Sequence, residues 1–407
     1  MRLVKDKTHL LVSRPKNWPK SEDIPILYDN IPISESLSTE HLGIIRSSNL
    51  DNFLAIQDRI SKHFKALLPV LACGAARGHR GNPAAALRVE ALYASPVLFS
   101  GLASLVLSRS EIYILTKHHR QILQKIMRVF SKSPPESIYI LSGVPPAEAI
   151  LDLKMFNLLG MVARMGPKNP LHQIGVYLLV THSSFSWFSR LRVLSGKYKI
   201  MDPLQILLNP PDKIKYNQYL RKRIYDFWHS KLINQMSSKS SLKFLRGAFL
   251  PLGCGPHPLW LSCEGSPTAI AAAELQAKIL TGRYRDDYLV SKWKSSSDGA
   301  CSLCDFFPGD ISHYLTGDCP ALAEQLKKTL SHSFSYLSHY PTLLQTALTV
   351  YNSSRLEFAA FIADPSTNPL VIKLRQEFGS KFVWPLFRLS RAYILCMHRE
   401  RQRLMNA

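Results

Sequence analysis

The sequence predicts a mainly α-helical protein with a small β part near its amino terminus and a small metal-binding module toward its carboxyl end. Three observations lead to this prediction. Apolar residues recur at helical spacing over most of the chain after residue 48, short alternating runs occur before it, and residues 301–319 contain three cysteines and a histidine. A length of 407 residues predicts two or three domains with ordinary hydrophobic cores.

Charge is the most distinctive property of the composition. The chain has 51 Lys and Arg against 29 Asp and Glu, a formal net charge of +22. Such an excess repels itself unless a polyanion is near, so RNA or DNA is the expected partner and an anionic membrane surface is the alternative. No small-molecule substrate is evident from the sequence.

Cysteine usage and hydropathy point to the expected compartment. Seven cysteines spread over this length indicate a reduced, intracellular protein, with nucleus and cytoplasm both open. The most apolar stretch, residues 95–108, is too short to span a bilayer, and no secretory signal follows Met1. We therefore expect no membrane span.

The first 48 residues are the only region with a β pattern. Alternating runs at residues 8–13 and 24–28 are followed by residues 31–33 across an Asp-Asn turn, and then by a run at residues 41–46. A strand, a hairpin and a further strand are too few to fold alone. Residues 1–48 are therefore expected to be the edge of a larger domain.

Residues 49–135 have a helical pattern. One helix is expected at residues 50–68, with an apolar face formed by Leu50, Leu54, Ile56, Ile60, Phe64, Leu67 and Leu68, and another at residues 111–130. Between them lies the glycine-rich loop 74–83. Its glycines permit close backbone approach to a ligand, and Arg77 and Arg80 can neutralise phosphates. An ordinary helix-to-helix loop is the alternative.

Residues 136–296 are expected to form a basic region of short helices separated by prolines and glycines. Within it, residues 213–246 contain one acid, Asp226. The basic residues there are Lys213, Lys215, Arg221, Lys222, Arg223, Lys231, Lys239, Lys243 and Arg246, and the predicted buried stripe is Tyr216, Leu220, Ile224, Phe227 and Trp228. This face suits backbone contacts to nucleic acid, and a merely solvated helix face is the alternative.

Residues 297–330 are the predicted metal module. Its proposed ligands are Cys301, Cys304, His313 and Cys319, a set of types and spacings typical of tetrahedral structural zinc. Four protein ligands leave no open position for a catalytic water, so zinc would serve folding rather than chemistry. Buried free cysteines with a surface histidine are the alternative. Cys254, His257 and Cys263 form a partial set without a fourth ligand, for which we expect a structural use.

The remaining residues, 331–407, are predicted to be basic carboxyl-terminal helices. A second phosphate-facing surface is expected on the last of them, formed by Arg388, Arg391, Arg399, Arg401 and Arg403. Phosphate contacts of this kind fix the position of a nucleic acid with little reading of its sequence.

The tetrapeptide at residues 284–287 imitates the Tyr-x-Asp-Asp signature of reverse transcriptases. In those enzymes the two acids lie between apolar strands, and a third carboxylate helps to bind two cations. Asp286 and Asp287 instead follow Thr281-Gly282-Arg283, and no third acid has a comparable setting. We expect no catalytic residues and no catalytic magnesium site here.

Several motifs, taken in order, carry a family resemblance over residues 1–330. Lys7-Thr8 before an apolar run is similar to the segment after the catalytic hairpin of non-LTR (LINE-type) retrotransposon reverse transcriptases, although Val4 replaces the family's asparagine. Residues 41–44, His-Leu-Gly-Ile, resemble the primer grip. Further similarities lie at residues 187–192, 198, 202–204, 240–245 and 280–284, and at the Cys-His cluster.

The resemblance implies a residual palm edge at residues 1–48, a thumb at 49–135, a basic helical region at 136–296 and the terminal zinc module at 297–330. It implies nucleic-acid contacts by Lys7, Leu42 and Gly43, beside those expected of Arg77, Arg80, Lys215, Arg221, Lys222 and Arg223. In the family the metal-binding aspartates precede the Lys-Thr motif. We therefore expect a truncated, nucleic-acid-binding relative without polymerase activity of its own.

Two other functions stay open at this point. One is a structural or protein-interaction scaffold in which zinc only stabilises the fold. The other is an RNA-directed DNA polymerase, which requires that the missing palm precede this sequence or be supplied by another chain.

Overall fold

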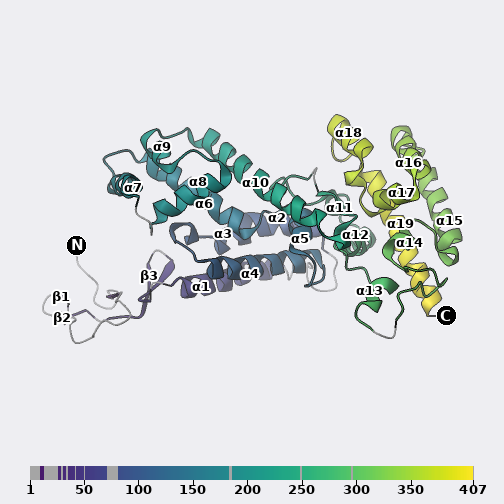
Figure 1. The fold of residues 1–407 in the computed structure, drawn as a ribbon, viewed down its shortest axis with the longest axis horizontal. Coiled ribbons are helices and arrows are strands. Elements are labelled where there is room, and N and C mark those ends of the chain that lie inside the picture. The colour runs from purple at the N-terminus through teal and green to yellow at the C-terminus, as the bar shows by residue number, and fades with distance from the viewer. Residues whose placement is uncertain are drawn as a thin grey trace. The chain divides into compact units, whose positions relative to one another are not determined.

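The computed structural model describes residues 10–12, 26–28, 31–33, 35–41, 43–49, 51–70, 81–182, 186–247, 250–294 and 297–406. Within them the fold is mainly helical, as predicted (Figure 1). Two compact units are present. The amino-terminal unit comprises residues 1–68, 92–118 and 147–224, and the carboxyl-terminal unit comprises residues 69–91, 119–146 and 225–407. The five consecutive segments expected from the sequence stay a prediction.

The β part consists of two short hairpins. Strands β1 (Leu27–Tyr28) and β2 (Ile31–Pro32) pair antiparallel, as expected. The single strand expected at residues 41–46 is wrong, because β3 (Ser38–His41) and β4 (Ile44–Ser47) pair antiparallel across a turn at Gly43. The φ angle of Gly43 is +76°, a conformation readily available to glycine, so the chain reverses inside this stretch.

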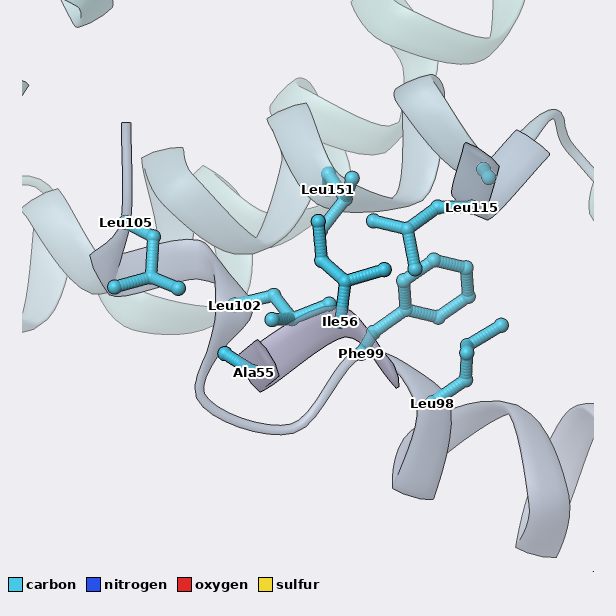
Figure 2. Close-up of a cluster of buried hydrophobic side chains, with 9 residues drawn as sticks. Ala55, Ile56, Leu98, Phe99, Leu102, Leu105, Leu115 and Leu151 are labelled. Atoms are coloured by element: carbon cyan, nitrogen blue, oxygen red, sulfur yellow. The ribbon is translucent and has the colours of Figure 1, made fainter. Parts of the chain in front are cut away.

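The core of the amino-terminal unit is built mainly from helices α1 (Phe53–Val70), α4 (Arg109–Met127) and α6 (Ala147–Arg164) and the short turns between them. Figure 2 shows this cluster, with Ile56 from α1 and Leu151 from α6 pointing toward one another. The other members are Ala55, Leu98, Phe99, Leu102, Leu105, Leu115 and Ala147, from α1, α3 (Ser95–Leu98), η5 (Leu102–Ser104), α4, α6 and adjoining residues. Burying each large side chain contributes about 1.5–3 kcal/mol.

Part of the apolar face expected on α1 is solvent-exposed. Leu54 is 39% exposed, Phe64 40% and Leu68 52%, whereas Ile56 and Leu67 are fully buried. The expected face is therefore too wide: the core accepts one stripe of this helix and leaves the flanking apolar residues outside.

Proline and a capping side chain start several helices of the amino-terminal unit. Asn169 caps α7 (Pro170–Val180), Asp202 caps α9 (Pro203–Leu208), and Ser186 forms a capping box with α8 (Trp187–Tyr198). Proline has no N–H to lose at the first helical position, and the cap satisfies the next free donor. Helices α6 and α7 pack against α9.

Helix α10 (Lys213–Ser237) is shorter than the basic segment from which it was predicted, and η6 (Ser240–Leu242) follows it. Its buried stripe contains Tyr216, Leu220, Ile224 and Trp228, as expected. Phe227 was also expected there, and this is wrong, because its side chain is 36% exposed. Its ring makes an edge-on contact with the ring of Trp228, with the two centres 6.1 Å apart, and stays partly open to solvent.

The carboxyl-terminal unit is all helical in its described part. Its elements are α2 (Pro83–Val89), α5 (Pro135–Ser142), α11 (Pro258–Leu261), α12 (Pro267–Leu280), α13 (Asp287–Ser291), α14 (Ile311–Leu315), α15 (Pro320–Leu337), α16 (Pro341–Ser353), α17 (Arg355–Ala363), η8 (Pro365–Thr367), α18 (Pro369–Phe378) and α19 (Trp384–Met405), and the π-helical turn η4 (Glu90–Ala94) follows α2 (Figure 1). Helix α19 packs against α12, α15 and α17. None of the described helices is long and apolar enough to cross a membrane.

The phosphate-facing surface expected on α19 is wrong for two of its arginines. Arg391 is 6% exposed and donates to the carbonyl oxygen of Ser262 at 3.0 Å. Arg401 is 3% exposed and donates to the Asp287 carboxylate at 2.8 Å. Both guanidinium groups hold α19 onto distant segments, because a buried arginine needs partners for its donors.

Candidate metal centre

The loop between α13 and α15 brings the predicted ligands together. Cys301 and Cys304 lie in a tight turn, in which the N–H of Cys301 donates to the carbonyl oxygen of Phe306 at 2.8 Å. His313 is on α14, and Cys319 is the residue before α15. A Cβ atom on Gly309 would lie 2.6 Å from the backbone nitrogen of Cys301, so only glycine lets the loop close this tightly.

The four ligand atoms have the separations that a tetrahedral ion requires. All lie within 4.8 Å of one another. The sulfurs of Cys301 and Cys319 are 3.9 Å apart, and the sulfur of Cys304 is 3.3 Å from Nε2 of His313. Two sulfurs each about 2.3 Å from a tetrahedral zinc ion would be about 3.8 Å apart. This cluster can hold a metal ion, as the sequence predicted.

Burial shifts the pKa of two of these groups, Cys319 and His313. Cys301 and Cys319 are fully buried and His313 is 4% exposed. Burial raises the pKa of the Cys319 thiol to about 12, and the neighbouring Cys301 adds to the rise. Burial also lowers the pKa of His313, so its ring is neutral near pH 7 and a nitrogen lone pair is available. A divalent cation would replace the thiol protons and stabilise the buried thiolates.

Two acids of the Tyr-x-Asp-Asp-like tetrapeptide hold this loop in place. Asp287 accepts hydrogen bonds from the hydroxyl of Tyr314 at 2.6 Å and from the N–H of Ser302 at 3.0 Å. Asp286 accepts from the N–H groups of Leu289 at 2.7 Å and Ile311 at 2.9 Å. Both carboxylates are therefore engaged by donors in and around the metal module, which gives them a structural role.

The partial set Cys254, His257 and Cys263 does not converge on one point. Cys254 is exposed, Cys263 is buried, and Nε2 of His257 lies 3.2 Å from the carboxylate of Asp364. Within the described residues, the cluster at residues 301–319 is the one group of three or more His, Cys, Asp or Glu side chains that converges on a possible ion.

His257, Asp364 and Ser366 form a buried cluster that the sequence did not reveal. It has the residue types of a hydrolytic triad, but Asp364 and Ser366 both approach the same ring nitrogen, Nε2 of His257, at 3.2 and 3.4 Å. The other nitrogen accepts from the N–H of Leu259. A triad uses one ring nitrogen for the acid and the other for the nucleophile, and all three side chains here are 3% exposed or less. The cluster therefore fastens η8 to α11.

The predicted nucleic-acid contacts are partly described. Lys215, Arg221, Lys222 and Arg223 lie exposed on α10, and none forms an ion pair within the described part of the chain. The guanidinium of Arg223 lies 5.7 Å from the centre of the Tyr219 ring. Gly43 is at the turn of the β3–β4 hairpin. Lys7, Leu42, Arg77 and Arg80 lie outside the described residues.

Comparison with known proteins found no match for this chain among protein-family models, curated proteins or solved structures. The function is therefore inferred from the residues of the chain and the geometry of its sites.

Proposed function

We propose that this protein binds nucleic acid through its phosphates and that a structural zinc ion orders part of its carboxyl-terminal unit. The observation that supports binding most strongly is the basic face of α10. Lys215, Arg221, Lys222 and Arg223 are exposed there. Lys215 lies near the carboxylate of Asp212, and the other three have no ion-pair partner among the described residues. Unpaired cations on a chain of charge +22 repel one another, and phosphates would relieve that repulsion.

Zinc is the metal that fits the cluster. Three thiolates and one imidazole are soft and borderline ligands, which zinc prefers over magnesium or calcium. The four side chains would complete a tetrahedron, so the ion would fold the loop and offer no position to a substrate. Cys301 and Cys304 would hold it from one turn, and His313 and Cys319 from the next two elements.

The order of motifs supports a derivation from the carboxyl-terminal part of a non-LTR reverse transcriptase. In this proposal the chain retains surfaces that grip nucleic acid and does not itself copy it. The acids most similar to a polymerase signature, Asp286 and Asp287, are occupied by structural hydrogen bonds. A metal-dependent polymerase needs such carboxylates free to hold two cations.

Salt dependence of RNA binding tests this proposal. The triple variant Arg221→Ser, Lys222→Ser, Arg223→Ser should bind a 20-nucleotide RNA more weakly than the wild-type chain in fluorescence anisotropy. The slope of log affinity against log salt is negative, and each lost phosphate contact reduces its magnitude by about 0.7. The three substitutions should therefore reduce the magnitude of the slope by about 2. The charge-matched control, Lys327→Ser, Lys328→Ser, Lys373→Ser, removes exposed cations from α15 and α18 and should change the slope little.

Two results would contradict the proposal. Affinity of the wild-type chain that does not change between about 50 and 200 mM salt would exclude phosphate binding and favour a scaffold. Primer extension by the purified chain would exclude binding without copying.

A further inference from the structure

We propose that a cavity on the carboxyl-terminal unit holds one unpaired nucleotide of a bound strand, stacking its base on an aromatic ring and pairing its phosphate with arginine. The cavity has a volume of about 370 Å³ and is lined by Phe130, Ser131, Lys132, Arg283, Arg285 and Trp293. This volume is in the range of small-ligand sites. The inference deepens the proposed nucleic-acid binding and depends on it.

The end of helix α12 positions the two arginines. The N–H of Gly282 donates to the carbonyl oxygen of Ile279 at 2.9 Å, and that of Arg283 to Lys278 at 2.8 Å, the bond pattern of a Schellman motif. The φ angle of Gly282 is +64°, and a Cβ atom there would collide with the carbonyl oxygen of Ser241. Glycine is therefore required for the turn that leads the chain into Arg283.

The side chains of residues 283–286, which follow this turn, point alternately into two neighbouring cavities. Arg283 and Arg285 line the cavity, whereas Tyr284 and Asp286 line a neighbouring one and are 4% and 5% exposed. Side chains of an extended backbone point alternately to opposite faces. Because Asp286 also accepts from the N–H of Ile311 in the metal module, the same four residues join the module to the cavity.

The aromatic side chains offer an open surface for a base. Trp293 is 58% exposed, and its ring makes no ring or cation contact within the described residues. Phe130 is 38% exposed and has the guanidinium of Arg285 at 5.9 Å and the ammonium of Lys278 at 5.7 Å from its centre. Aromatic rings beside cations are the combination with which proteins hold unpaired bases.

The charges in the cavity are all positive. Lys132, Arg283 and Arg285 form no ion pair with a carboxylate of the described residues, and no acid lines the cavity. Arg283 donates to the carbonyl oxygen of Lys132 at 2.6 Å, which fixes the guanidinium in the lining of the cavity. A guanidinium fixed in this way can present its remaining N–H donors to a phosphate.

The aromatic rings of the cavity indicate which kind of polyanion would bind there. A duplex keeps its bases stacked inside, and a polysaccharide such as heparin has none, so either could use the cations but not Trp293. An unpaired nucleotide supplies both a base face and a phosphate. It is the occupant that uses every feature of the cavity.

The test compares three variants on three probes. Trp293→Ala should weaken binding of a single-stranded oligouridylate by about tenfold, and Trp293→Phe should restore most of it, because stacking needs a ring. Binding of an RNA duplex and of heparin should not change. Tyr177→Ala removes an exposed aromatic ring, 66% exposed, from the amino-terminal unit and should have no effect. Unchanged thermal melting would show that Trp293→Ala folds normally.

The outcomes separate this inference from the function on which it rests. If the wild-type chain binds none of the three probes, both fail. If it binds them but Trp293→Ala leaves oligouridylate affinity intact, or weakens heparin equally, the nucleotide site is overturned while phosphate binding stands. A further readout is tryptophan fluorescence: oligouridylate should quench it in the wild-type chain and much less in Trp293→Phe.

Discussion

Asp287 shows how one residue can hold two parts of the chain together. Its carboxylate accepts from Tyr314 and Ser302 in the metal module and from Arg401 on α19. The guanidinium of Arg401 is nearly inaccessible, so a lost carboxylate would leave a buried charge without its partner.

We predict that Asp287→Asn lowers the free energy of unfolding by about 3 kcal/mol, the usual cost of breaking a buried ion pair by removing one member. Chemical denaturation monitored by circular dichroism would measure it. Asp305→Asn is the matched control, because Asp305 is an exposed aspartate of the same loop and should change stability by less than about 0.5 kcal/mol. Equal effects of both variants would show that the Asp287 contacts contribute nothing.

At the same scale, the metal ligands could be predicted from the sequence because all four lie within residues 301–319. The partners of the arginines could not. Arg391 contacts Ser262 and Arg401 contacts Asp287, pairs separated by more than a hundred residues. The sequence shows that α19 is rich in arginine. Whether an arginine is exposed or buried depends on how α19 packs, which the sequence alone does not show.

At the scale of elements, α6 can pack closely against α10 because residue 160 is glycine. A Cβ atom on Gly160 would lie 2.6 Å from the ring of Tyr216. That ring is 4% exposed, and its hydroxyl donates to the carbonyl oxygen of Phe156. The ring is thus fixed by packing and by a hydrogen bond, and has little room to move aside.

Gly160→Ala is expected to destabilise the protein by about 1–3 kcal/mol, because overpacking outweighs the better helix propensity of alanine. Gly196→Ala in α8 provides the contrast. Nothing lies within 4 Å of a Cβ atom there, so alanine should stabilise by about 0.5–1 kcal/mol. Thermal melting of the two variants would measure the difference, and a stabilising Gly160→Ala would contradict the packing.

Glu111 joins the start of α1 to the start of α4. Its carboxylate accepts from the N–H groups of Asn52 at 2.9 Å and Ser108 at 2.6 Å. Burial raises the pKa of Glu111, but these hydrogen bonds outweigh it and hold the pKa below 4.5. A lowered pKa means that the contribution to stability is present above pH 4.5 and is lost as the pH falls through the folded-state value.

Glu111→Gln should therefore destabilise the protein by about 1 kcal/mol at pH 7, since an amide cannot accept from both donors. The difference from the wild-type chain should vanish at a pH below the folded-state pKa. Urea denaturation at pH 7 and at a series of lower pH values measures it, with Glu377→Gln, an exposed glutamate, as the control. A difference that does not shrink as the pH falls would exclude the ionised carboxylate as its cause.

Helices could be predicted from the sequence where short stretches of it mark their starts or their buried faces. Prolines with capping residues mark the starts of α7, α9 and α12, and heptad-like spacing marks α4 and α10. The β3–β4 hairpin was missed because its strands are short and the four residues of β3, Ser-Thr-Glu-His, have no apolar alternation that would indicate a strand.

At the scale of the whole molecule, the two units have different chemistry. Lys215, Arg221, Lys222 and Arg223 belong to the amino-terminal unit. The metal cluster and the cavity lined by Phe130 and Trp293 belong to the carboxyl-terminal unit. The cavity could not be predicted from the sequence, because Phe130 and Trp293 lie far apart along the chain. From the overall charge we predict nucleic acid as the class of partner, but the charge does not identify the side chains that would contact it.

The most direct test of this account is the zinc content of the purified chain, measured by plasma mass spectrometry after dialysis. We predict about one zinc per wild-type chain and almost none in Cys301→Ser, Cys304→Ser, with earlier melting of that variant. Cys254→Ser, Cys396→Ser removes two thiols outside the cluster and should retain the zinc. Zinc that is absent from the wild-type chain, or that remains bound without Cys301 and Cys304, would contradict the account.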